Sequence, residues 1–67
     1  MVKVFFWMKE GESRSVDLSL GTYQLLDSRA RSLKTGFTYI LIEVFKFYGQ
    51  VTEVDLLNFL KTSSQPN

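Results

Sequence analysis

Two segments near the start of the chain have the character of β-strands. Residues 2–8 are rich in β-branched and aromatic residues, and apolar and polar residues alternate over residues 13–20. In the second segment, even-numbered positions carry the apolar residues and Arg14, while the odd-numbered positions carry serines and Asp17. The polar stretch Lys9-Glu10-Gly11-Glu12 between the segments suits a four-residue hairpin loop. We therefore expect an N-terminal antiparallel hairpin.

The first strand differs from the second because both of its faces carry large apolar side chains. Val4 and Phe6 share one face, and Phe5 and Trp7 share the other. If helices cover the first face, Phe5 and Trp7 lie exposed on the second, beside polar residues of the other strand. Aromatic residues with a polar rim are typical of the centre of a protein interface. The predicted partner-binding residues are Phe5, Trp7, Ser15, Asp17 and Ser19. The alternative is that the C-terminal tail or the last helix covers the two aromatic residues.

A first helix is predicted after Gly21, where the spacing of apolar residues changes to three and four. Thr22 is the expected N-cap and Gly36 the expected end of this helix. Asp27 and Arg31 are four residues apart and can form an ion pair on its outer side.

A second helix is predicted over residues 39–48, capped by Thr38, with Phe37 and Ile42 in the positions of a hydrophobic staple. It is so apolar that we expect it to be central and buried on most sides. A strand is the competing prediction for residues 39–48, because β-branched residues alternate within it.

A third helix is predicted over residues 53–61. Gly49 can adopt the left-handed conformation that ends the preceding helix. Thr52 and Asp55 have the spacing of a capping box, and Val51 and Leu56 that of a hydrophobic staple. Residues 62–67 are polar and are expected to be a flexible tail. The predicted fold is α+β, a single domain over residues 1–61 with an N-terminal hairpin followed by three short helices.

Composition limits the chemistry and favours association. The chain has 67 residues, no cysteine and no histidine, so disulfides and the usual zinc ligands are excluded. A chain this short buries only about 60% of the surface that its unfolded form exposes, and association is a common source of additional stability. We expect a homodimer, no cofactor or metal, and no enzymatic activity, because no catalytic motif is present. No apolar run approaches the ~18 residues of a membrane span, and without a visible secretory signal we expect a cytoplasmic protein.

The charged residues give a second, weaker indication. Eight Lys and Arg against seven Asp and Glu leave a net charge of +1. Basic residues near the end of the first helix are favoured by the helix dipole whatever the function. They could also contact phosphates, which gives affinity without sequence preference. The possible nucleic-acid contacts are Arg14, Arg29, Arg31 and Lys34.

The order Ser15-Val-Asp-Leu-Ser-Leu20, a helix, Gly36-Phe37-Thr38 and a second helix resembles that of ribbon–helix–helix repressors, over residues 15–48. In that family two chains pair their strands into a ribbon that enters the major groove of DNA. The resemblance implies a dimeric DNA-binding regulator with Ser15, Asp17 and Ser19 as base readers. Asp17 departs from this pattern, since phosphates repel a carboxylate.

Residues 39–61, two helices joined through Gly49-Gln-Val51-Thr52, are similar to the first two helices of winged-helix domains. No recognition helix follows them, so this likeness implies a packing arrangement and not base reading. The sequence thus predicts a small regulatory protein-binding module, an inhibitor or adaptor, with a ribbon–helix–helix-like DNA-binding regulator as the alternative.

Overall fold

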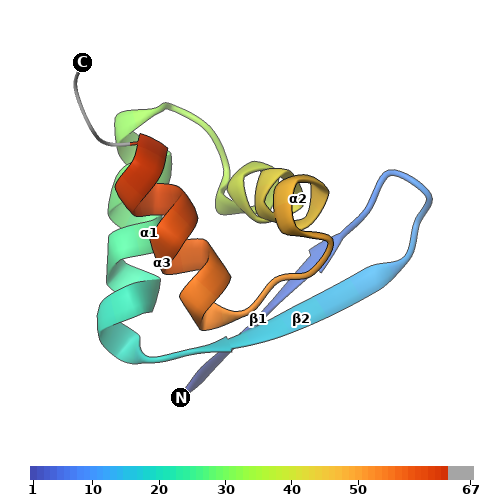
Figure 1. Ribbon diagram of the computed structural model, residues 1–67, viewed down its shortest axis with the longest axis horizontal. Coiled ribbons are helices and arrows are strands. Elements are labelled where there is room, and N and C mark those ends of the chain that lie inside the picture. The colour runs from blue at the N-terminus through green and yellow to red at the C-terminus, as the bar shows by residue number, and fades with distance from the viewer. Residues whose placement is uncertain (64–67) are drawn as a thin grey trace.

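The computed structural model describes residues 1–63 and shows an α+β fold, a two-stranded antiparallel hairpin followed by three helices (Figure 1). The strands are β1 (Val2–Trp7) and β2 (Ser13–Leu18). The helices are α1 (Leu20–Ser32), α2 (Phe37–Tyr48) and α3 (Glu53–Ser63). The order of elements predicted from the sequence is confirmed. Helix α3 extends two residues into the predicted tail, and residues 64–67 lie outside the described part of the chain.

The hairpin closes more tightly than the predicted four-residue loop. The backbone N–H of Gly11 donates to the carbonyl of Met8 at 2.9 Å, and the N–H of Met8 donates to the carbonyl of Glu12 at 2.8 Å. Gly11 has a φ of 89°, in the left-handed region that favours glycine. This is the pattern of a type I turn followed by a glycine bulge. It sets the register in which Val4 pairs with Val16 and Phe6 with Arg14.

The core lies between the inner face of the hairpin and the three helices. In Figure 1 the helices gather on one side of the hairpin, and α1 and α3 run side by side. Every helix contacts the other two, α2 also contacts β1, and α1 and α3 also contact β2. The buried hydrophobic residues come from all five elements: Val4, Phe6, Val16, Leu18, Leu26, Ala30, Ile40, Leu41, Val44, Leu56 and Leu60.

The predicted start of α1 is wrong by three residues. The N-cap is Ser19, whose hydroxyl accepts a hydrogen bond from the backbone N–H of Thr22 at 3.3 Å. Thr22 lies within the first turn and is buried. The apolar–polar alternation runs on to Leu20 in the sequence, which hides the cap, although Leu20 is itself helical and exposed.

The predicted junction between α1 and α2 is also shifted. Helix α1 ends at Ser32, and Lys34 adopts a left-handed φ of 56°. Gly36 is the N-cap of α2, so it precedes this helix and does not terminate α1. Thr38 is not a cap, because α2 already begins at Phe37.

Helix α2 confirms the helical prediction for residues 39–48 and excludes the strand alternative. The expectation that it is buried on most sides is wrong. Ile40, Leu41 and Val44 are buried, whereas 60% of Tyr39 and 73% of Phe47 is exposed. Two short helices and one hairpin can cover only one side of α2.

The start of α3 agrees with the sequence prediction. Gly49 has a φ of 77° and ends α2. The hydroxyl of Thr52 accepts from the backbone N–H of Asp55 at 3.1 Å and donates to the Asp55 carboxylate at 2.9 Å. The same carboxylate accepts from the Gln50 amide at 3.0 Å. Leu56 is buried and Val51 packs against the core, as expected of the staple.

Candidate protein-interaction surface

The hairpin has one face packed on the helices and one face turned away from them. The inner face carries Val4, Phe6, Val16 and Leu18, all buried. Side chains of neighbouring strand residues point to opposite faces. The odd-numbered residues of the two strands therefore form the outer face, and all of them are exposed: Lys3, Phe5, Trp7, Ser13, Ser15 and Asp17.

The register divides the outer face into an aromatic end and a charged end. Trp7 lies opposite Ser13 and Phe5 opposite Ser15, so each aromatic ring has a small hydroxyl residue as its cross-strand neighbour. Serine side chains are too short to cover the rings. At the far end Lys3 lies directly opposite Asp17.

Phe5 and Trp7 are 56% and 60% exposed, respectively. The alternative in which α3 covers them is excluded, because α3 packs with the other helices on the inner side of the hairpin (Figure 1). The tail, the other part of that alternative, lies outside the described residues from position 64 onward. The predicted exposure of the two aromatic residues is confirmed.

Ser19, the fifth predicted partner-binding residue, lies beyond the end of β2 and has a structural role. Its backbone N–H and its hydroxyl donate to one oxygen of the Glu53 carboxylate, Oε2, at 2.9 Å and 2.8 Å. The hydroxyl also lies 3.0 Å from that of Thr22. Ser19 thus joins the start of α1 to the start of α3.

These contacts also change the acidity of Glu53. The backbone N–H of Ser19 and the hydroxyls of Thr22 and Ser19 lower the pKa of the Glu53 carboxyl, because they stabilise its charged form. Ser19 and Glu53 are 34 residues apart, so no local spacing in the sequence predicts the contact.

Of the four basic residues considered for nucleic-acid binding, Arg14 lies apart from the three near the end of α1, and the three arginines are engaged in different contacts. The guanidinium of Arg14 lies 4.5 Å from the ring centre of Phe45, and it is 3.6 Å from the carboxylate of Glu12. Arg31 forms the predicted ion pair with Asp27 at 3.0 Å. The start of β2, which holds Arg14, and the end of α1 lie at opposite ends of the molecule (Figure 1).

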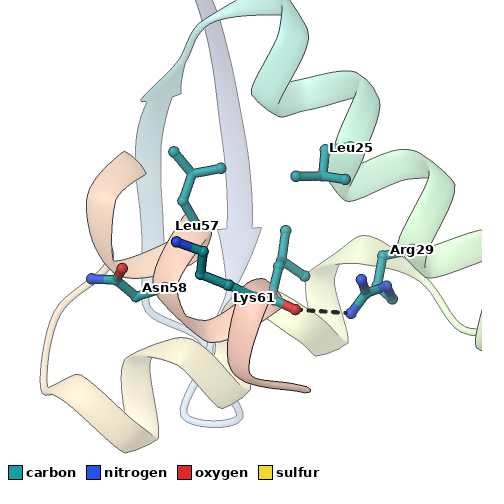
Figure 2. Close-up of a pocket in the computed structure, with 6 residues that line it drawn as sticks. Leu25, Arg29, Leu57, Asn58 and Lys61 are labelled. Carbon is teal, nitrogen blue, oxygen red and sulfur yellow. Dashed lines mark hydrogen bonds between the residues drawn. The ribbon is translucent and has the colours of Figure 1, made fainter. Parts of the chain in front are cut away.

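Arg29 lies in a different setting, between α1 and α3. Its guanidinium donates to the backbone carbonyl of Leu60 at 3.2 Å (Figure 2). Lys34, in its left-handed conformation, directly follows α1. Arg29 therefore links two helices, a role that the sequence did not indicate.

A shallow groove of about 340 Å³ lies between α1 and α3 and was not predicted. Leu25 and Leu57 face it from the two helices, with Arg29 and Lys61 toward the C-terminal ends of these helices (Figure 2). Leu25 and Leu57 are 42% and 38% exposed. No signal in the sequence identifies this groove, because it depends on how the two helices pack.

The described residues contain neither a cluster of metal ligands nor a helix that could span a membrane. Within residues 1–63, no three or more acidic, histidine or cysteine side chains come together in a group that could hold a metal ion. None of the helices in this part of the chain has the length and apolar character needed to cross a bilayer. The outer face of the hairpin holds four of the five predicted partner-binding residues, Phe5, Trp7, Ser15 and Asp17. The chain has no significant match to a protein-family model, to a curated protein or to a solved structure.

Proposed function

We propose that the chain is a non-catalytic protein-binding module of regulatory type, an inhibitor or adaptor, whose contact surface is the outer face of the hairpin. The observation that carries this proposal is the exposure of Phe5 and Trp7 side by side on a face that the helices leave uncovered. Tryptophan and its aromatic neighbours are the residues that most often dominate binding energy at protein interfaces.

The composition of the outer face favours a protein over DNA as the partner. Lys3 and Asp17 offset each other, so this face carries no net charge. DNA binding requires several cations that neutralise phosphates together. Asp17 would oppose that contact.

The ribbon–helix–helix alternative has less support. It requires β2 to pair with the same strand of a second chain, and β2 here pairs with β1 of its own chain along one of its two edges. The Ser19 hydroxyl, one of the implied base readers, is bound to Glu53. A protein contact on the outer face of the hairpin leaves this Ser19–Glu53 contact in place.

The proposal is tested by comparing what three immobilised proteins retain from a lysate of the source cells: the wild type, Trp7→Ala and Phe47→Ala. Phe47 is the matched control, because it is an even more exposed aromatic residue, at 73%, on α2. A true partner is retained by the wild type and by Phe47→Ala. Trp7→Ala should weaken its binding by about 2 kcal/mol or more while circular dichroism shows an intact fold.

Equal retention by Trp7→Ala and the wild type would contradict the proposal. The DNA alternative predicts the opposite pattern: binding to duplex DNA that falls steeply with added salt and that Arg29→Ala with Arg31→Ala weakens more than Trp7→Ala does. We expect no such salt-dependent binding.

A further inference from the structure

We propose that a second copy of this chain occupies the outer face, and that the two hairpins pack face to face about a two-fold axis parallel to the strands. This inference rests on the proposed function and names the partner. Lys3 and Asp17 carry opposite charges at facing positions of the two strands, which makes the face complementary to itself. Within residues 1–62, neither side chain forms an ion pair of its own.

The symmetry decides which residues meet. In a two-fold interface, residue i of one copy contacts residue j of the other, and the reverse contact follows. A two-fold axis along the strands lays β1 of each copy over β2 of the other. Because Lys3 and Asp17 are cross-strand neighbours, each Lys3 then faces Asp17 of the second copy, and the two ion pairs form together.

The aromatic end fits the same arrangement. Trp7 lies over Ser13 of the second copy and Phe5 over Ser15, since these are the cross-strand neighbours in the hairpin. A large residue facing a small one lets two layers interdigitate at the ~10 Å spacing of packed sheets. Water is thereby excluded from both pairs of aromatic rings.

The other two-fold arrangement is less favourable. An axis perpendicular to the strands lays β1 over β1, so Lys3 faces Trp7 and Asp17 faces Ser13 of the second copy. This arrangement leaves both carboxylates without a cation at the interface. Charge complementarity therefore selects the axis parallel to the strands.

The size of the face sets the strength of the dimer. Six residues on two strands span roughly 20 Å by 10 Å. This footprint is well below the ~800 Å² per partner of a standard stable interface. We expect a weak dimer, present only at high protein concentration, toward the millimolar range, and dissociating on dilution, with a melting temperature that rises with protein concentration.

The test uses sedimentation equilibrium on two charge-reversal variants, Lys3→Asp and Asp17→Lys. Each variant alone places like charges against each other in the dimer, and its dissociation constant should rise at least about tenfold. When the two variants are mixed, each new aspartate faces a new lysine, and association should return to near the wild-type value. The two residues within each chain remain like-charged on mixing, so recovery reports contact between chains.

Lys9→Asp and Glu10→Lys provide the matched control, because they change the net charge by the same amounts at exposed positions of the hairpin turn. Each control variant should dimerise like the wild type, and mixing the two should not strengthen association. Wild-type protein that remains monomeric, or charge-reversal variants whose mixture recovers no more than the control mixture, would overturn the proposal. A monomeric wild type would leave the proposed function standing if Trp7→Ala still lost a protein partner.

Discussion

Replacing Thr52 by alanine tests the cap of α3 directly. The variant loses the hydroxyl that accepts a hydrogen bond from the backbone N–H of Asp55 at 3.1 Å and donates one to the Asp55 carboxylate at 2.9 Å. Loss of a threonine cap typically costs about 1 kcal/mol. The Gln50 amide still holds the Asp55 carboxylate at 3.0 Å, so we expect a value near this average and not at the upper end of the range.

This loss is large for so small a protein. A domain of 67 residues has a total stability of roughly 3–10 kcal/mol. A change of about 1 kcal/mol lowers the melting temperature of such a domain by roughly 4–8 °C. Thermal unfolding followed by circular dichroism at 222 nm, at one fixed protein concentration so that association does not contribute, measures this shift.

Thr38→Ala is the matched control. It makes the same chemical change in the first turn of α2, where Gly36 and not threonine occupies the cap position. Alanine has the higher helix propensity there, so the control should lose little or no stability. An unchanged melting temperature for Thr52→Ala, or an equal drop in both variants, would refute the role of Thr52 as a cap.

Two further predictions concern the backbone and pH. Gly49→Ala should destabilise the fold by about 1–2 kcal/mol, because Gly49 has a φ of 77°. Gly21 lies inside α1 with open space around it, so Gly21→Ala should stabilise the fold by about 0.5–1 kcal/mol. Urea titration of both variants measures the two changes in unfolding free energy, and a change of the opposite sign in either variant would contradict its prediction. Because the pKa of Glu53 is lowered in the folded state, its contribution to stability is present above the ordinary glutamate pKa and is lost as the pH falls through the lowered value. The difference in melting temperature between wild type and Glu53→Gln should therefore shrink on acidification through that range, and a difference independent of pH would contradict the Ser19–Glu53 contact.

The sequence predicted those features that depend on residues close together in the chain. Gly49, Thr52 and Asp55 fall within seven positions, and Gly49 has the left-handed conformation and Thr52 the capping hydrogen bond that their spacing indicated. The Asp55 carboxylate accepts from the Thr52 hydroxyl, whereas a capping box uses the backbone N–H of the cap residue. The exposure of Phe5 and Trp7 followed from strand alternation, once all helices lay on one side of the hairpin.

Several errors arise from contacts between distant segments. The strand alternation runs through Ser19, but its hydrogen bonds to Glu53, 34 residues away, and to the nearby Thr22 hold it at the start of α1. The exposure of Phe47 on α2 depends on how many elements surround that helix, which periodicity does not reveal. The groove between Leu25 and Leu57 likewise exists only once two helices are packed.

The exposed position of Trp7 determines the wavelength at which the tryptophan fluorescence of the protein should be strongest. It is the chain's one tryptophan, and 60% of it faces solvent in the folded state. Its emission maximum should already lie at long wavelength before denaturant is added, and unfolding should shift it little. The indole is therefore a poor reporter of the core, whereas its emission should move to shorter wavelength when a second molecule covers the hairpin.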